Sequence, residues 1–187
     1  MDNNGFVFID GSNFYFKLRD LTSKFDAKIS LLNFDFAKFA KWLAGDNNLI
    51  GICYYIGALR RQVGNVKSEQ MYNDQQKLFR KLQKQGAQIA LGQLIRHPDK
   101  SYHEKGVDVQ LAVEMIRFAR QDRYDIAYLV SSDTDLAPAV EEVKALGKRV
   151  QYVGTANGQS FGLSVVSDDV RLLRVEDIEP FLPKFLL

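Results

Sequence analysis

The stretch "FVFIDGSNFY", residues 6–15, decides how the fold of this chain is interpreted. Four apolar residues run without polar alternation into Asp10, which predicts a short strand covered on both faces. Gly11, Ser12 and Asn13 follow at once. Gly11 permits a tight turn, and Ser12 and Asn13 supply short polar groups that can hydrogen-bond a carboxylate or a metal-bound water. The pattern indicates that the end of this strand borders a functional site.

The rest of the chain alternates short apolar runs with amphipathic helical patterns. This alternation predicts βαβ units, a parallel sheet and helices on both of its faces. The predicted fold class is therefore α/β, a three-layer sandwich with a central, mostly parallel sheet of about five strands. The apolar runs are residues 5–10, 49–59, 87–95, 125–132 and 148–154, and the helical patterns cover residues 34–45, 68–86, 107–120 and 135–147.

Composition predicts a single domain over residues 1–187, with one sizeable core. The formal charge of +2 does not by itself indicate a nucleic-acid binder. Cys53 is the only cysteine, which excludes an internal disulfide and fits a small buried side chain. We expect a cytoplasmic protein without membrane contact, because no signal peptide pattern and no apolar run of roughly 20 residues occurs. The short apolar tail at residues 180–187 is expected to pack on the domain, with a homodimer contact as the alternative.

Four aspartates from distant parts of the chain are expected to meet at one edge of the sheet. Asp10 ends the first strand, and Asp133 and Asp135 follow a second strand in "YLVSSDTDLAP". In an open parallel sheet, ligands bind beyond the carboxyl ends of the strands. Asp108 precedes Leu111, Ala112 and Met115 by three, four and seven residues, and these three share the apolar face of one predicted helix. Asp108 is therefore expected on the core-facing side at the start of that helix.

Such a cluster of carboxylates needs a cation, because close like charges repel one another. Oxygen-only ligands favour a hard divalent ion, Mg²⁺ or Mn²⁺, which can bind a phosphodiester and activate water. The alternative is that the aspartates are helix caps: Asp133 or Asp135 for the helix that follows them, and Asp108 for its own helix. The metal site is favoured because three features occur together: Asp10 at a strand end, Asp108 facing inward, and the closely spaced pair Asp133 and Asp135.

Basic side chains are expected to hold phosphate groups near the same edge. Arg60 and Arg61 follow the second apolar run directly. Residues 93–105 are expected to form a polar loop just before Asp108, and loops of this length are often functional. The alternative is ordinary solvated charge, and zinc binding by the histidines is disfavoured because no cysteine supports it. This loop carries Arg96, His97, Lys100, His103 and Lys105.

The motifs together resemble the NYN domain family, a branch of the PIN-like ribonucleases, and in particular its LabA-like bacterial members. The matching blocks are "FIDGSNFY", "KGVDVQLAVEM", "LVSSDTDLAPAVEEVKALGKRVQYVG" and the closing "SFGLSVVSDDVRLLRVEDI". The resemblance covers about residues 5–178 and implies a Rossmann-like, PIN-like sheet and a metal-dependent nuclease site acting on RNA. Carried over by position, it implies acidic residues at Asp10, Asp108, Asp133 and Asp135, with Asn13 beside them and Lys105 as the basic residue ahead of G-V-D.

The sequence therefore predicts an Mg²⁺- or Mn²⁺-dependent ribonuclease. Asp10, Asp108 and Asp133 would hold the ion, Asp135 would bind the ion or orient water, and Asn13 would position Asp10 or the hydrated ion. The expected substrate-binding residues are Lys105, Arg60, Arg61, Ser12, Arg96 and His103. Two alternatives are a non-catalytic module that binds RNA or a protein, and a metal-dependent phosphatase. A haloacid-dehalogenase-like site is disfavoured because position 12 is serine, and an integrin-type metal site because position 14 is phenylalanine.

Overall fold

The computed structural model describes residues 3–23, 31–96 and 102–182 of the chain. In these residues seven strands form one sheet in the order β4-β3-β2-β1-β5-β6-β7. Neighbouring strands are parallel, except that β4 pairs antiparallel with β3. The predicted α/β class is confirmed, with more strands than expected. The strands are β1 (Asn4–Asp10), β2 (Asn48–Ala58), β3 (Gln88–Arg96), β4 (Tyr102–Lys105), β5 (Ile126–Val130), β6 (Arg149–Thr155) and β7 (Asp169–Leu173).

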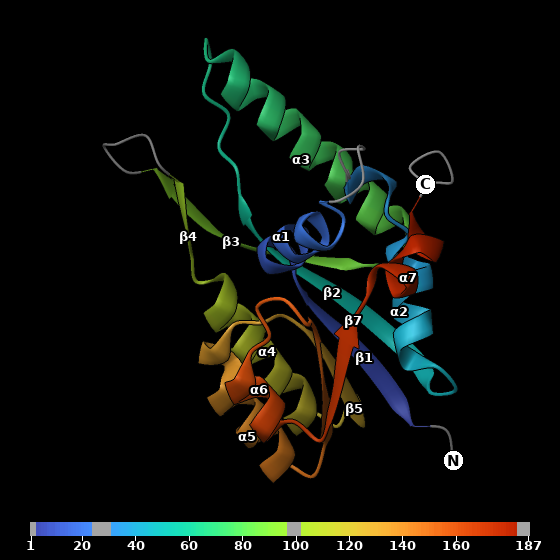
Figure 1. The fold of residues 1–187 in the computed structure, drawn as a ribbon. Coiled ribbons are helices and arrows are strands. Elements are labelled where there is room, and N and C mark those ends of the chain that lie inside the picture. The colour runs from blue at the N-terminus through green and yellow to red at the C-terminus, as the bar shows by residue number, and fades with distance from the viewer. Residues whose placement is uncertain (1–2, 24–30, 97–101, 183–187) are drawn as a thin grey trace.

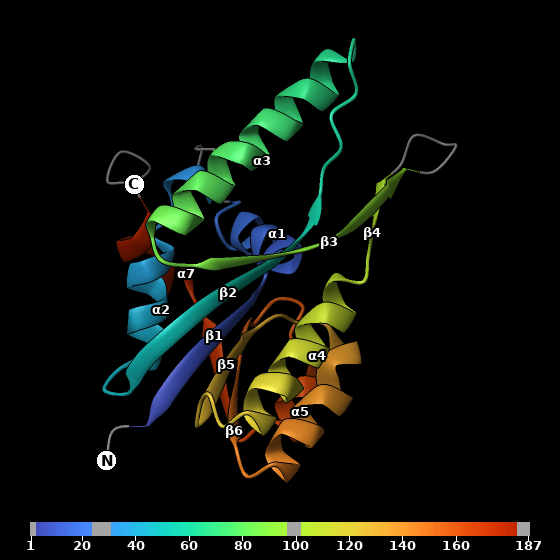
Figure 2. The same cartoon turned by 180° about the vertical axis from the view of Figure 1, so that it is seen from behind.

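Helices cover both faces of the sheet and complete three layers (Figure 1, Figure 2). One face carries α1 (Gly11–Leu21), α2 (Phe36–Ala44), α3 (Val66–Lys84) and α7 (Val175–Ile178), and the other carries α4 (Val107–Arg120), α5 (Ala137–Ala145) and α6 (Phe161–Val166). Three short 3₁₀ turns are η1 (Leu31–Asn33), η2 (Thr134–Leu136) and η3 (Glu179–Phe181). Among the helices of the described residues, none has the length and apolar character to cross a bilayer.

Strand β1 shows why consecutive apolar residues predict a strand covered on both faces. Phe6 and Phe8 belong to the core beneath α4 and α5, whereas Val7 and Ile9 belong to the core beneath α1 and α2. All four side chains are at most 1% exposed. Successive residues of a strand point to opposite faces, so a sheet with helices on both sides needs apolar residues at every position.

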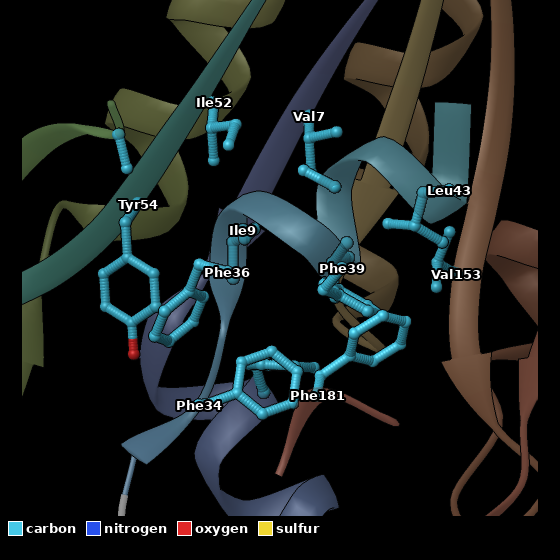
Figure 3. Close-up of a cluster of buried hydrophobic side chains, with 14 of the residues drawn as sticks. Val7, Ile9, Phe34, Phe36, Phe39, Leu43, Ile52, Tyr54, Val153 and Phe181 are labelled. Atoms are coloured by element: carbon cyan, nitrogen blue, oxygen red, sulfur yellow. The ribbon is translucent and has the colours of Figure 1, made fainter. Parts of the chain in front are cut away.

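Aromatic rings fill the core on the side of α1 and α2 (Figure 3). Phe34 makes edge-to-face contacts with Phe14 at 5.4 Å, with Phe39 at 5.4 Å and with Phe181 at 6.1 Å between ring centroids. Phe181 and Leu182 are buried, so the described part of the apolar tail packs on this core. Residues 183–187 of the tail lie outside the described residues.

The junction of β1 and α1 differs from the expected tight turn. Helix α1 begins at Gly11, immediately after Asp10 ends β1. A Cβ at Gly11 would lie 2.4 Å from Cε1 of Tyr54, whose hydroxyl donates a hydrogen bond to the Gly11 carbonyl at 3.2 Å. Glycine is required here because the Tyr54 ring packs directly against the start of the helix.

Residues 93–105 were expected to form a polar loop, and this expectation is wrong. Residues 93–96 complete β3, and Tyr102–Lys105 form the antiparallel edge strand β4. Edge strands commonly carry charged residues, so they lack the apolar signal that predicts inner strands. The other edge strand, β7, escaped prediction in the same way. The predicted loop residues His97 and Lys100 lie outside the described residues, as do residues 24–30.

Candidate functional site

The sheet has a topological switch point between β1 and β5. From β1, strands β2 and β3 extend the sheet to one side, and β5, β6 and β7 extend it to the other. In open parallel sheets, such a point forms a crevice beyond the carboxyl ends of the strands, where ligands bind. Strand β1 ends at Asp10, and β5 ends at Val130, one residue before Ser131. Two of the acidic segments therefore border the same crevice.

Hydrogen bonds hold both oxygens of the Asp10 carboxylate. Oδ1 accepts from the backbone N–H of Asn13 at 3.1 Å, which makes Asp10 the N-cap of α1. Oδ2 accepts from the hydroxyl of Ser131 at 3.1 Å, which joins the ends of β1 and β5. Asp10 is thus both a cap and a cross-strand link, and its two oxygens lie in fixed positions at the crevice.

Ser131 connects Asp10 to the acidic turn after β5. Its hydroxyl oxygen accepts a hydrogen bond from the backbone N–H of Asp133 at 3.1 Å while donating to Asp10. Asp133 in turn caps η2, because its Oδ1 accepts from the backbone N–H of Asp135 at 3.0 Å. Ser131 is 2% exposed, so its hydroxyl is shielded from water, whereas Asp10 and Asp133 are half-buried.

Asn13 and Lys17 line the same crevice from α1. The Oδ1 of Asn13 accepts from the backbone N–H of Ser132 at 3.1 Å, so the asparagine side chain fixes the acidic turn. Lys17 lies one helical turn further on, and its Nζ donates to the carbonyl oxygens of Asn157 at 3.2 Å and Gly158 at 2.8 Å. Helix α1 therefore spans from the end of β5 to the loop after β6.

A second set of hydroxyl groups supports the acidic turn from behind. Ser132 Oγ and the Tyr152 hydroxyl lie 3.1 Å apart, and the Tyr152 hydroxyl accepts from the backbone N–H of Ser160 at 3.0 Å. Thr134 Oγ1 and Ser160 Oγ lie 2.9 Å apart. These contacts tie the turn to β6 and to the start of α6, so its backbone is constrained from both ends.

Asp108 lies in a different environment. It occupies the first turn of α4 and is exposed, whereas its neighbour Val107 and the following Leu111 are buried. The expectation of a core-facing position is therefore wrong, because the buried stripe of α4 runs through Val107, Leu111 and Met115 and Asp108 lies outside it. The capping alternative for Asp108 is also wrong, since the N-cap is Gly106, with φ +77° and no side-chain hydrogen bond.

The described residues contain no group of three or more His, Cys, Asp or Glu side chains placed to hold one metal ion. The four-aspartate cluster expected from the sequence is not assembled in them. Asp10 and Asp133 are joined through Ser131, while Asp135 is exposed in the first turn of η2. The crevice therefore offers a cation the carboxylate of Asp10 and, through the backbone link made by Ser131, the neighbouring Asp133.

The expected phosphate-binding residues lie in or just after β1, β2, β3 and β4. Arg60 and Arg61 are exposed after β2, and Arg61 Nη2 pairs with Glu69 Oε1 at 3.3 Å. Lys105 ends β4 and is exposed. Arg96 and His103 are described only as backbone positions in β3 and β4. Ser12 is half-buried in the first turn of α1.

The sequence interpretation missed the hydroxyl groups that hold the aspartates. Ser131 and Ser132 precede the acids in "SSDTD", and that spacing was the available signal. Tyr152 carried no such signal, because only the tertiary structure brings β6 beside the turn. Lys17 was missed because a lysine on an amphipathic helix is ordinary until its partners are known.

A buried polar network lies beneath α4 on the same face of the sheet as Asp10. Tyr55 pairs with Asp10 across the strands, and its hydroxyl donates to Glu114 Oε2 at 2.8 Å. Glu114 also pairs with Arg117 at 3.2 Å. Burial raises the pKa of Tyr55, and it raises the pKa of the Cys53 thiol to about 11. Both groups stay neutral near pH 7, so Cys53 is an inert buried side chain.

Comparisons with known proteins place this arrangement among NYN domains. The NYN domain family matches residues 6–171. A crystal structure of a protein of unknown function from Vibrio parahaemolyticus superposes with a TM-score of 0.68 at 20% identity, covering 97% of each chain, which shows the shared fold. An isopentenyl phosphate kinase matches at TM-score 0.41 and 11% identity, covering 80% of this chain and 90% of that one, too weak to support an argument. No curated protein matches the chain.

Proposed function

The chain belongs to the NYN domain family, and we propose that it is a divalent-metal-dependent ribonuclease that cleaves RNA phosphodiesters at the crevice between β1 and β5. The family lies in the PIN-like nuclease superfamily, which supports a nuclease. The observation that carries the proposal is that Ser131 ties the carboxylate of Asp10 to the backbone of Asp133 at the topological switch point, so that both acids border one crevice.

The donor set fits Mg²⁺ or Mn²⁺. These ions prefer oxygen ligands, and Mg²⁺ is commonly held by one or two carboxylates together with waters and substrate phosphates. Asp10 and Asp133 therefore suffice without a third fixed acid, and Asp108 and Asp135 would act on the ion or its waters from exposed positions. A bound ion would polarise the phosphoryl oxygen and lower the pKa of the attacking water.

The protein's own residues would position the substrate and the carboxylates. The backbone N–H of Asn13 and the hydroxyl of Ser131 orient the two oxygens of Asp10. Lys105 and Arg60 are exposed cations that can hold phosphate groups, and Arg61 would contribute less because Glu69 already pairs with it. Ser12, Arg96 and His103 stay predicted substrate contacts.

RNA cleavage by matched variants tests the proposal. Wild type, Asp133→Asn and Asp46→Asn are incubated with assorted single-stranded RNAs and Mn²⁺ or Mg²⁺. Asparagine is a good N-cap, so Asp133→Asn removes charge while η2 keeps its cap. We expect a loss of about a hundredfold in its cleavage rate. Asp46 is exposed between α2 and β2, at the opposite edge, and its variant should cleave as wild type does. Equal activity in wild type and Asp133→Asn would contradict the proposal.

The second candidate is a non-catalytic module that binds RNA or a protein. It is favoured by the capping roles of Asp10 and Asp133, and by the lack of a group of three ligands among the described residues. This candidate predicts salt-sensitive RNA binding and no cleavage with any divalent ion. A chromogenic phosphate ester screen tests the phosphatase alternative. Membership of the LabA-like branch, a cytoplasmic location and a homodimer stay predictions.

A further inference from the structure

A groove of about 670 Å³ opens beside the candidate site, between α1 and α3. Its lining begins at Gly11 and Ser12, the two residues that directly follow Asp10 in the chain. Tyr54 and Ile56 of β2 contribute apolar surface, and Leu78 contributes from α3. A volume of this size lies within the usual range of small-ligand sites, which runs from about 300 to 1,000 Å³.

Two exposed aromatic rings and an arginine line the α1 side of the groove. Phe16 is 54% exposed and Tyr15 is 36% exposed, and their ring centroids lie 5.5 Å apart. The guanidinium carbon of Arg19 lies 5.0 Å from the centroid of Phe16 and 6.0 Å from that of Tyr15. Exposed rings beside a hollow are typical of a binding surface, and the arginine adds a positive charge that suits a phosphate.

The α3 side of the groove is already fixed by hydrogen bonds. Gln75 accepts from the backbone N–H of Leu59 at 2.9 Å and donates to the carbonyl of Gly57 at 2.8 Å, so its buried amide holds the end of β2. Asp74 accepts from Gln70 at 2.8 Å and from Lys77 at 3.0 Å, which lowers its pKa and offsets its charge. The groups left to select a ligand are therefore the rings and Arg19.

We propose that this groove binds an unpaired base of the RNA strand whose phosphate lies at Asp10 and Asp133. The base would stack on Phe16 and Tyr15, and Arg19 would hold the adjoining phosphate. Stacking on aromatic rings tolerates any base, because every base has a π-face, but it requires the base to be unpaired. The inference rests on the proposed function for the position of the phosphate, and it adds a preference for single-stranded RNA.

Binding without cleavage tests the groove separately from the catalytic proposal. Fluorescein-labelled single-stranded RNA and a duplex of the same sequence are titrated by anisotropy in the presence of a chelator. Phe16→Ala should weaken single-strand binding by about fivefold to a hundredfold and leave duplex binding unchanged. Phe16→Leu keeps an apolar side chain but loses the ring face, so it should also weaken binding, whereas Phe16→Trp should retain it. Thermal melting checks that each variant is folded.

Arg19→Ala should weaken single-strand binding and reduce its salt dependence, because one phosphate contact is lost. Arg120→Ala is the matched control, since Arg120 is an exposed arginine in the last turn of α4, on the other face of the sheet. Wild-type affinity in all Phe16 and Arg19 variants, or no single-strand binding by wild type, would overturn the groove assignment. If wild type cleaves RNA but the Phe16 and Arg19 variants bind single-stranded RNA as wild type does, only the groove proposal is overturned. If these variants weaken binding but wild type cleaves no RNA, only the ribonuclease proposal is overturned.

Discussion

Asp10 and Asp108 have the same side chain and the same predicted role, yet the fold places them differently. Asp10 ends a buried strand, and each of its oxygens accepts a hydrogen bond from another part of the site. Asp108 is exposed in the first turn of α4, a helix whose N-cap is a glycine without a side-chain bond. The sheet holds the acid at the end of an inner strand in place, whereas the acid in the first turn of α4 lies exposed to solvent.

Removing the two charges in turn should give the largest effect. We expect Asp10→Asn to lower RNA cleavage about a hundredfold and Asp108→Asn about tenfold, because hydrogen bonds preorganise the carboxylate of Asp10 for the ion, whereas that of Asp108 is exposed to solvent. Initial cleavage rates at saturating Mn²⁺ measure both. Equal losses would show that substrate or ion binding fixes Asp108 as firmly as Asp10.

The link through Ser131 provides the next test. Ser131→Ala should lower cleavage about tenfold and destabilise the fold by about 1–3 kcal/mol, because Asp10 Oδ2 and the N–H of Asp133 lose their partner in a buried position. Urea unfolding measures the stability change. Ser23→Ala, at an exposed serine after α1, should change neither quantity. A Ser131→Ala protein with wild-type activity would refute the relay.

The smallest expected effects are on stability, and they measure the capping role of Asp10 apart from its role in cleavage. Asp10→Ala should cost about 1–2 kcal/mol of unfolding free energy, because both the N-cap of α1 and the acceptor of the buried Ser131 hydroxyl are lost. Asp108→Ala should cost less than about 0.5 kcal/mol, because surface substitutions away from such features are usually small. Urea midpoints of the two variants make the comparison. A larger cost for Asp108→Ala would reveal a stabilising contact that its exposed position does not suggest.

The inner strands were predictable from the sequence because their signal is local. In β1, Val7 and Ile9 face one core while Phe6 and Phe8 face the other. Because both faces are buried, every one of these positions is apolar. Edge strands gave no such signal, and so β4 was expected to be a loop. The same locality explains why Asp10 was predicted correctly at a strand end, while the exposure of Asp108 was not foreseen.

Local patterns in the sequence identify the residues that could carry the chemistry: acids at the ends of apolar runs, with small polar residues around them. Which of these residues come together depends on the tertiary structure. Strand order brings β5 beside β1, so that Ser131 bridges Asp10 and Asp133, and it brings α1 and α3 together over β2 to form the groove. Strand ends and helix faces can be predicted from the pattern of neighbouring residues. The pairing of strands that are distant in the chain depends instead on the burial of the whole core.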